Sequence, residues 1–468
     1  MWFFVRFFGI LFKMEKSEQN NLMEKIISLC KRRGFVFPGS EIYGGLANSW
    51  DYGPVGVELK NNIKQLWWRR FVQSREDVVG IDASLIMNPK VWEASGHLST
   101  FNDPLVECRK CNGRFRAEPT LGLDGEINLN EEDWKKLICA NCGAKGSLSQ
   151  PKQFNLMLKT FLGPAEEAAN VVYFRPETAQ AMFVDFKNVL QTTRKKLPFG
   201  IAQIGKAFRN EITPGNFIFR TREFEQMEIE YFIRPPKTDE DWQSSFEMWR
   251  KEMISWMKDI GIDINKVHEL EVSKDKLAHY SKRTIDFEYE FPFGIKELYG
   301  LAYRTDFDLK NHAAASKEDL SYLDPETNEK LIPHVIEPTW GVDRTVLAVL
   351  CSAFDDSNPD RAVLKFPYKL APYKVAVFPL MKNKPELVAK AKEIFDSLRG
   401  NFMVAWDDRG NVGKRYYSQD EIGTPFCVTI DFDSLEDGAV TVRDRDTMKQ
   451  DRIKIVELKN YLREKLEI

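Results

Sequence analysis

The sequence has almost no net charge. Its 67 basic and 70 acidic residues give a formal charge of −3, and the pI lies near 6.1. A chain with this balance has no general attraction to nucleic acid. Any contact with RNA must therefore come from a local basic surface.

The sequence also lacks an apolar run long enough to cross a membrane. The apolar stretch 1–12 is interrupted by Arg6 and is shorter than the roughly 20 residues that a membrane-spanning helix needs. No small-residue cleavage site follows it, which argues against a signal peptide. We expect no membrane association. We expect residues 1–21 to be a leader, either a frayed tail or a segment that lies in part upstream of a true start at Met14.

Two common nucleotide-binding signatures are missing. The sequence contains neither a GxxxxGK[ST] loop near a strand nor an opening glycine-rich dinucleotide fingerprint, so P-loop and Rossmann enzymes are disfavoured. It also has no internal repeat or low-complexity tract. A length of 468 residues with 43% hydrophobic side chains is instead typical of a globular protein with two or three domains.

Cysteine is scarce, but four of the seven cysteines form two C-x-x-C pairs. A two-residue gap lets both thiolates of a pair reach one tetrahedral metal ion. In a chain without a secretion signal the pattern favours metal over disulfides and a cytoplasmic location. We expect a structural zinc ion in an insertion over residues 106–150, held by Cys108, Cys111, Cys139 and Cys142. The alternative is four buried thiols in a small core.

The periodicity of the chain predicts two larger units. Helical spacing marks residues 22–30 and 57–72, and Trp242, Trp249 and Trp256 recur every seven residues, which is typical of a buried helix. After Pro367, strand and helix patterns alternate to the end of the chain. Helical spacing marks Leu387, Ala391, Ile394 and Leu398, and a final helix is marked by Leu458, Leu462 and Leu466. We therefore expect one unit over residues 22–366 and a separate α/β unit over residues 367–468.

A long antiparallel hairpin is predicted where two strand-like runs, 200–211 and 219–231, flank a turn. Alternation puts Arg209 and Glu211 on one face of the first run and Phe208 on the other. In the second run one face carries Arg222, Phe224, Gln226 and Glu228, and the opposite face carries Met227, Ile229 and Tyr231.

The polar face of this hairpin has the groups that hold a nucleotide without a P-loop. Arginine suits phosphate oxygens, glutamate accepts a hydrogen bond from an adenine amino group, and phenylalanine stacks on a base. Solvated surface charges are the plainer alternative. A third segment, EPTWGVDR (337–344), leads into an apolar helix and puts Arg344 in its first turn. A bound anion would offset the unfavourable position of this arginine beside a helix N-terminus.

These segments resemble motifs 1, 2 and 3 of class II aminoacyl-tRNA synthetases. Motif 1 corresponds to residues 57–72 with the strand leading to Pro89, motif 2 to the hairpin and motif 3 to residues 337–344. Longer segments resemble the dimeric glycyl-tRNA synthetases: GSEIYGGLANSWDYGPVG (39–56), NPKVWEASGH (88–97), RPETAQ (175–180), FRTREFEQME (219–228), EPTWGVDR and the closing residues 413–447. The resemblance runs from about Met23 to the C-terminus.

The resemblance implies a fold and a partition of the chain. The fold is an α+β catalytic core, a six-stranded antiparallel class II synthetase sheet flanked by helices, with the zinc-binding insertion inside it. Residues 367–468 would be an α/β anticodon-binding domain. It also implies a homodimer.

The resemblance further implies two neighbouring binding sites. The catalytic residues would be Arg209 and Arg344. ATP would be bound by Arg209, Asn210, Glu211, Phe219, Arg220, Thr221, Arg222, Glu223, Phe224, Glu297, Leu298, Gly341, Val342, Asp343 and Arg344. Glycine would be bound by Arg116, Glu177, Phe224, Glu225, Gln226, Met227, Glu228, Glu337, Pro338, Thr339, Trp340 and Gly341. The family usually has serine where Thr339 stands, so the added methyl group narrows this position.

The implied reaction is that of a glycine–tRNA ligase. Glycine would react with ATP to form glycyl-adenylate and pyrophosphate, and the glycyl group would pass to the 3′ end of tRNA(Gly). Carboxylate groups of the site would attract the ammonium group of glycine. Protein atoms would occupy the space that the side chain of a larger amino acid needs, and so exclude it. Because the carboxylate of glycine is already ionised, no general base is needed. Arginine side chains and Mg²⁺ would position ATP and neutralise the negative charge of its phosphate groups.

Two alternatives are open. Another class II synthetase, for threonine, proline or serine, would need space for a side chain. A synthetase-like nucleic-acid-binding protein without catalytic activity would lack the motif arginines, whereas Arg209, Glu211, Arg222 and Arg344 are all present.

Overall fold

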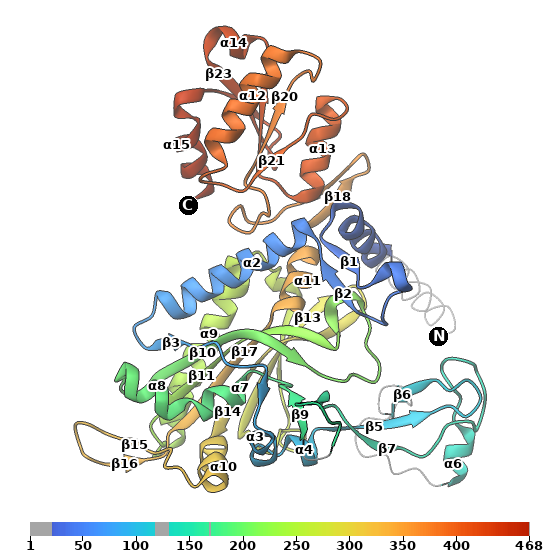
Figure 1. The fold of residues 1–468 in the computed structure, drawn as a ribbon, viewed down its shortest axis with the longest axis vertical. Helices are drawn as coiled ribbons and strands as arrows, with labels where there is room; N and C mark the ends of the chain where they lie inside the picture. The colour runs from blue at the N-terminus through green and yellow to red at the C-terminus, as the bar shows by residue number, and fades with distance from the viewer. Residues whose placement is uncertain (1–20, 118–130, 168–169, 468) are drawn as a thin grey trace, which may run out of the picture.

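The computed structural model describes residues 21–117, 131–167 and 170–467. Figure 1 shows a central body built around a large sheet, a small lobe that carries β5–β7 and α6, and a C-terminal part that carries α12–α15. Residues 1–20 of the expected leader, with Met14, and residues 118–130 of the expected insertion lie outside the described residues.

The central sheet has seven strands. Six of them are antiparallel neighbours, and β3 is added at one edge parallel to β10. The expected six-stranded antiparallel sheet is therefore extended by one strand, which lies between the helix of motif 1 and Pro89, where the resemblance implied a strand. The order is β12 (Val267–Glu271), β13 (Arg283–Phe291), β14 (Gly294–Thr305), β17 (His334–Gly341), β11 (Glu223–Ile233), β10 (Phe199–Phe208) and β3 (Val78–Gly80).

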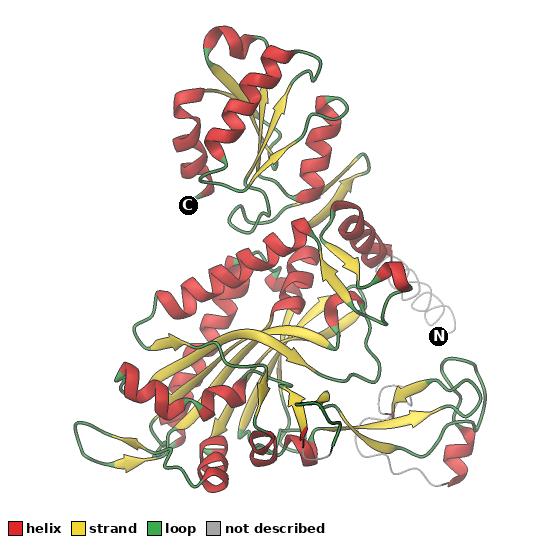
Figure 2. Ribbon diagram, in the orientation of Figure 1, coloured by secondary structure: helices red, strands yellow, loops and turns green. Residues whose placement is uncertain are grey.

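Long helices cover one face of this sheet, here called the core face. Met227, Ile229 and Tyr231 point from β11 into a hydrophobic core shared with these helices, which Figure 2 shows packed along the sheet. The three tryptophans of the seven-residue repeat are buried in this core, on α9. The helices are α2 (Pro54–Trp68), α9 (Asp239–Asp259) and α11 (Val342–Ala353).

The opposite face of the sheet is only partly covered. A second core joins its hydrophobic end to three helices and includes Phe199, Ile201 and Phe232. Because Phe199, Gln203, Glu228 and Phe232 lie on the same side of the sheet by alternation, the polar residues further along these strands face a space that the helices leave open. We call this side the cavity face. The helices are α7 (Ala179–Val184), α8 (Phe186–Thr193) and α10 (Phe307–Ser316).

The glycine-rich passage before α2 is more regular than expected. It contains β1 (Val36–Pro38), a short 3-10 helix (Glu41–Tyr43) and β2 (Trp50–Tyr52). The helix then begins at Pro54, three residues before the expected start at Val57, because proline suits the first helical position. A π-helical turn, Arg69–Gln73, continues it. A Cβ atom on Gly56 would lie 1.9 Å from the carbonyl oxygen of Phe35, so only glycine fits there.

The helix predicted over residues 22–30 spans 21–33. It ends at Gly34, whose φ of 75° is the left-handed conformation that terminates helices. From this helix Arg32 donates to Glu421 at 2.7 Å, and Arg33 pairs with the same carboxylate. These contacts join the N-terminal helix to the C-terminal part.

The C-terminal part is a five-stranded mixed sheet, ordered β21-β20-β22-β23-β24. Its elements are β20 (Val375–Pro379), α12 (Pro385–Leu398), β21 (Val404–Trp406), α13 (Val412–Ile422), β22 (Phe426–Ile430), α14 (Asp433–Asp437), β23 (Ala439–Asp444), β24 (Gln450–Lys454) and α15 (Ile455–Leu466). The residues expected inside α12 and α15 are all buried. Two short elements, the exposed edge strand β24 and the helix α14, carry no apolar period.

The remaining labelled helices and strands lie outside the two large sheets. They are β4 (Ile86–Met87), α3 (Pro89–Ala94), α4 (His97–Thr100), β5 (Asn102–Glu107), β6 (Arg114–Arg116), α6 (Glu131–Lys136), β7 (Lys152–Asn155), β8 (Lys159–Phe161), β9 (Val171–Phe174), β15 (Tyr322–Leu323), β16 (Lys330–Leu331), β18 (Phe354–Asn358) and β19 (Arg361–Leu364). Of the helices described, none is long and apolar enough to cross a membrane.

Candidate active site

A cavity of about 360 Å³ opens on the cavity face of the central sheet. It lies over β11, β14 and β17 and is bounded by the loop that joins β10 to β11. Most of the predicted site residues line it: Glu177, Arg209, Glu211, Phe219, Arg220, Thr221, Phe224, Glu225, Gln226, Glu228, Glu297, Leu298, Glu337, Thr339, Gly341, Asp343 and Arg344. Residues that are far apart in the sequence therefore meet in one place.

The hairpin predicted for motif 2 is present, but its strands are shorter than expected. Pairing ends at Phe208 and Glu223, so Arg209, Glu211 and Arg222 belong to the connecting loop and not to strand faces. Asn216 and Phe217 have φ values of 56° and 58°, so the backbone of this loop is not extended where the chain reverses. The alternation on the second strand is confirmed, since Phe224, Gln226 and Glu228 face the cavity.

Arg209 is held at the middle of the cavity. Its Nε donates to the carbonyl oxygen of Pro176 at 3.0 Å. Its guanidinium carbon lies 5.3 Å from the ring centroids of Phe101 and Phe224. The group is thus fixed by one hydrogen bond and two aromatic contacts, which leaves its other N–H groups for an anion.

Arg344 lies in the first turn of α11, as predicted. Its guanidinium group donates to the backbone oxygen of Glu297 at 3.0 Å and lies 3.3 Å from the carboxylate of the same residue. It also lies 4.6 Å from the ring centroid of Phe219. The positive charge of Arg344 lowers the pKa of the Glu297 carboxyl group below its ordinary value.

Asp343 and Glu225 connect the cavity to α2. Lys60 of that helix lies 3.0 Å from Asp343 and 2.9 Å from Glu225. The hydroxyl group of Tyr52 donates to Asp343 at 2.6 Å, and the backbone N–H of Glu225 donates to its other oxygen at 2.8 Å. Both carboxylates are therefore engaged in joining β11, α2 and α11.

Three carboxyl groups gather at the other end of the cavity. Glu228 accepts hydrogen bonds from the hydroxyl groups of Thr178 and, at 2.9 Å, Thr339. Glu337 accepts from Arg304 at 2.8 Å, and Glu177 accepts from Gln180 at 3.0 Å. These three carboxyl groups, held by hydrogen bonds, form an acidic end to the cavity.

Burial and mutual repulsion shift the pKa values of these carboxyl groups in different directions. Burial, with the neighbouring Glu228 and Glu177, raises the pKa of Glu337 to about 8. Burial and Glu177 also raise the pKa of Glu228. By contrast, His97, 3.4 Å away, holds the pKa of Glu177 well below its usual range against the effect of burial. Glu177 is therefore the member of the group that ionises most readily.

Several predicted residues lie beside the cavity but do not line it. Met227 and Trp340 point into the core, where Trp340 packs against Trp67 and Phe71. Arg222 donates to the backbone oxygen of Ala47 at 3.2 Å. Also outside the lining are Asn210, Glu223, Pro338 and Val342.

Arg116 lies on β6 of the small lobe, 3.1 Å from Asp103. It does not line the cavity either.

Some residues that line the cavity, or lie directly behind its wall, were not predicted. Arg304 of β14 is 1% exposed and grips Asp308 through two N–H groups at 2.9 Å while it also reaches Glu337. Tyr280 stacks 3.8 Å beneath its guanidinium group, and Asp286 lines the cavity further along. None of these lies in a recognised motif, and their strands gave no signal beyond alternation.

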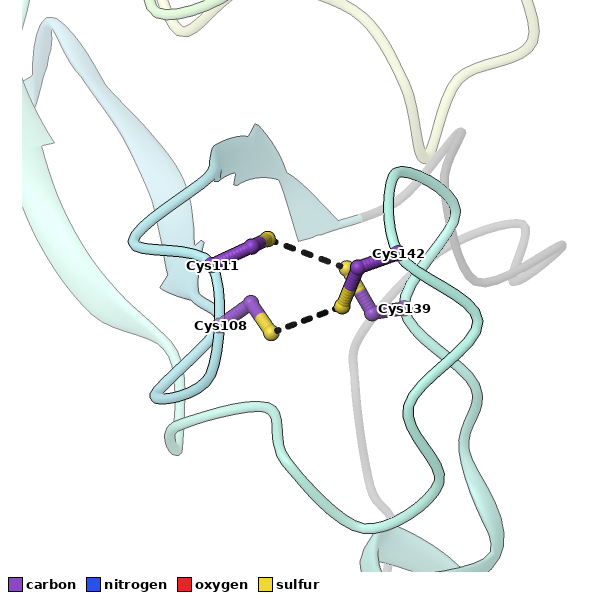
Figure 3. A group of neighbouring side chains, drawn as sticks. All are labelled: Cys108, Cys111, Cys139 and Cys142. Carbon is purple, nitrogen blue, oxygen red and sulfur yellow. Dashed lines mark hydrogen bonds between the residues drawn. The ribbon is translucent and has the colours of Figure 1, made fainter.

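The four cysteines of the two pairs meet in the small lobe, as Figure 3 shows. The sulfur atoms of Cys108 and Cys142 lie 3.7 Å apart, and those of Cys111 and Cys139 lie 3.8 Å apart. All four sulfur atoms lie within 4.8 Å of one another. None of them is in a disulfide.

Comparison with known proteins identifies the class. Residues 164–353 match the tRNA synthetase class II core domain (G, H, P, S and T). Residues 374–465 match the anticodon binding domain. The central sheet and the C-terminal sheet are therefore the two parts of a class II tRNA synthetase.

Full-length relatives narrow the class to one family. The chain is 53% identical to the glycine–tRNA ligase of Alkaliphilus oremlandii over 95% of its own length and 98% of the relative's. Identity is 54% to that of Lachnospira eligens, over 95% and 98%, and 52% to that of Acetivibrio thermocellus, over 96% and 100%. The chain belongs to the glycine–tRNA ligase family.

Proposed function

We propose that this cavity activates glycine with ATP and that the glycyl group then passes to the 3′ end of tRNA(Gly). One observation carries the proposal: a single cavity has three carboxyl groups, Glu177, Glu228 and Glu337, at one end and guanidinium groups at the other. Between Glu228 and Phe224, and between Glu337 and Gly341, four residues of strand span about 13 Å. This length accommodates a small amino acid beside a nucleotide.

Glycine would place its ammonium group among the three carboxyl groups. The hydroxyl groups of Thr178 and Thr339 fix Glu228, and Arg304 fixes Glu337, so these acceptors are ordered before glycine arrives. Pro338, Trp340 and Met227 would shape the site from behind, and Arg116 would reach it from the small lobe. Ala302 and Gly300 form part of the cavity wall.

ATP would occupy the other end. The adenine would stack on Phe224, beside Glu211 and with Leu298 and Gly341 against it. The triphosphate would follow Arg220, Arg222 and Arg344. Further contacts would come from Asn210, Phe219, Thr221, Glu223, Glu297, Val342 and Asp343.

Arg209 would hold the α-phosphate. Its Nε is bonded to Pro176, the residue before Glu177, so the guanidinium group lies between the carboxyl end and the nucleotide end. The ionised carboxylate of glycine attacks the α-phosphorus, the bond to the bridging oxygen breaks, and pyrophosphate leaves. No side chain has to remove a proton. The contribution of the protein is positioning and the charge of Arg209 and Arg344.

Class II synthetases generally use ATP with Mg²⁺. The carboxylate groups of Asp286 and Glu297 line the nucleotide end and would hold the ion, since Mg²⁺ prefers oxygen ligands. When bound, it neutralises phosphate charge.

The four cysteines fit a structural zinc ion. Zinc–sulfur bonds of about 2.3 Å in a tetrahedron put neighbouring sulfur atoms about 3.8 Å apart, which agrees with the 3.7 and 3.8 Å of the two cross-pairs. Four thiolates leave no open position, so the ion would hold the shape of residues 106–150 and take no part in the reaction.

Membership of the family supports a proposal for the larger assembly. Residues 22–366 would form the catalytic domain, and residues 367–468 would bind the anticodon of tRNA(Gly). We further propose that the enzyme is a homodimer and that it works in the cytoplasm.

The experiment is ATP–pyrophosphate exchange with each of the twenty amino acids, followed by aminoacylation of tRNA(Gly). The proposal expects exchange with glycine alone and glycine-dependent charging. Exchange with a larger amino acid, or with none, would contradict it.

A further inference from the structure

Glu230 is a buried carboxyl group that the proposed mechanism does not use. It lies on β11 two residues from Glu228, on the same side of the strand, and its side chain is 0% exposed. It does not line the cavity. Neither of its oxygen atoms has a hydrogen-bond partner among the described residues.

Its neighbours are acidic groups, or are already hydrogen-bonded to other residues. Oxygen atoms of Glu228, Glu230 and Glu337 all lie within 4.8 Å of one another, and the strand register puts Glu337 opposite Glu230 across the β11–β17 pair. The nearest cation, Arg304, directs its hydrogen bonds to Asp308 and Glu337. An ionised and unpaired carboxylate in this environment would be very costly.

We propose that Glu230 is a positioning residue of the amino-acid site, a neutral carboxyl group whose O–H holds the carboxyl groups of Glu228 and Glu337 toward the cavity. The inference rests on the proposed function of that cavity.

The electrostatic surroundings support a neutral group. Burial, followed by Glu337, raises the pKa of Glu230 well above its ordinary value, with smaller contributions in the same direction from Glu228 and Asp308. Arg304 acts in the opposite direction but does not outweigh them. The O–H group can reach an acceptor by a small side-chain rotation or through one water molecule, since a water bridges oxygen atoms up to about 5.5 Å apart at ordinary hydrogen-bond lengths.

A neutral donor here would have a clear consequence for glycine. It would stabilise the ionised forms of Glu228 and Glu337 that attract the ammonium group, without adding a further negative charge of its own. Its loss should therefore weaken glycine binding and leave ATP binding nearly unchanged.

Two substitutions at one position separate the possibilities. Glu230→Gln keeps a neutral donor of the same shape and should retain the wild-type KM for glycine within about twofold. Glu230→Met keeps the volume but removes the donor, and it should raise the KM for glycine roughly tenfold or more, with the KM for ATP and kcat changed far less. The pH dependence of kcat/KM for glycine should be the same in Glu230→Gln and the wild type.

Other patterns would overturn the inference. If Glu230→Gln is as damaging as Glu230→Met, the group acts as a charged carboxylate, for example toward a bound cation. If neither substitution changes the KM for glycine, Glu230 only fills space.

Infrared difference spectra of the wild type and Glu230→Gln give a readout that does not need activity. At neutral pH the substitution should remove the carbonyl band of a protonated carboxylic acid. Loss of carboxylate bands instead would refute the inference. This measurement also applies if the wild-type protein fails to exchange pyrophosphate with glycine, which would refute the proposed function and not the state of Glu230.

Discussion

At the scale of single residues, the position of Arg209 is defined by contacts that do not use its full hydrogen-bonding capacity. One N–H group is bonded to Pro176, and the aromatic rings of Phe101 and Phe224 hold the plane of the guanidinium group. The remaining N–H groups are therefore directed by the fold and available to a phosphate.

Replacing Arg209 with alanine should reduce glycine-dependent pyrophosphate exchange by at least 10²- to 10³-fold, the usual effect of removing one group that stabilises developing charge. Thermal unfolding should change little. Arg250→Ala is a matched control, because Arg250 of α9 pairs with Glu269 of β12, away from the cavity lining. Exchange close to that of the wild type would refute the role of Arg209.

Glycine binding should depend on pH through Glu337. Its pKa of about 8 means that the carboxyl group is protonated in the empty site at pH 7, whereas the ammonium group of glycine favours the ionised form. Binding at pH 7 should therefore release protons, and the affinity should rise as the pH increases from 6 to 8.

Titration calorimetry in two buffers of different ionisation enthalpy measures this release directly. The observed heat should differ between the buffers for the wild type and differ much less for Glu337→Gln. Equal heats for the wild type would show that Glu337 does not lose a proton on binding.

The sequence predicted part of the site at this scale. Alternation along one strand placed Phe224, Gln226 and Glu228 together, because neighbouring side chains of a strand point to opposite faces. It could not indicate Arg304 or Glu230, whose importance depends on which strands become neighbours. Asp343 was predicted from the resemblance, but its partners Tyr52 and Lys60 were not.

At the scale of elements, the approach of α2 to the segment before it leaves no room for a side chain at position 56. The Cβ of an alanine there would lie 1.9 Å from the carbonyl oxygen of Phe35, so the helix would have to move. Motion of α2 would disturb the core that it shares with α11.

Gly56→Ala should therefore lower the free energy of unfolding by about 2 kcal/mol or more. Gly413→Ala in α13 is the control, since its Cβ would meet its nearest atom at an ordinary 3.6 Å. That change should be neutral or slightly stabilising, because alanine is the better helix former. Denaturant unfolding of both variants provides the comparison, and equal stability would contradict the steric argument.

Elements with a strong apolar period were predicted well. Leu387, Ala391, Ile394 and Leu398 are all buried on α12, because their spacing puts them on one helical face. Short edge strands such as β3 and β24 carry no such period. The boundaries of the motif 2 strands were also wrong, since the backbone of the loop decides where pairing stops.

At the scale of the whole molecule, the small lobe has little hydrophobic core of its own. Its described clusters comprise few buried residues, and one of them consists mainly of the cysteines. The catalytic sheet has a separate and much larger core. Loss of a metal ion should therefore affect the lobe first.

Cys108→Ser should lower the zinc content, and limited proteolysis should cut the chain between β5 and β7 while the catalytic and C-terminal fragments resist. Cys351→Ser is the control, because Cys351 is buried in α11 and far from the pairs in the sequence. Elemental analysis and mass spectrometry of the fragments provide the measurements. An unchanged metal content would argue for a small core of buried thiols instead.

The ion pairs that Asp343 and Glu225 form with lysine have a further consequence for the whole molecule. Lys60 of α2 reaches both of them, and Lys64 of the same helix also pairs with Glu225. We expect a shift of the axis of α2, such as the docking of another protein chain could cause, to act on the three ion pairs and so on β11 and α11 where they border the cavity. Contacts made far from the cavity could reach it in this way.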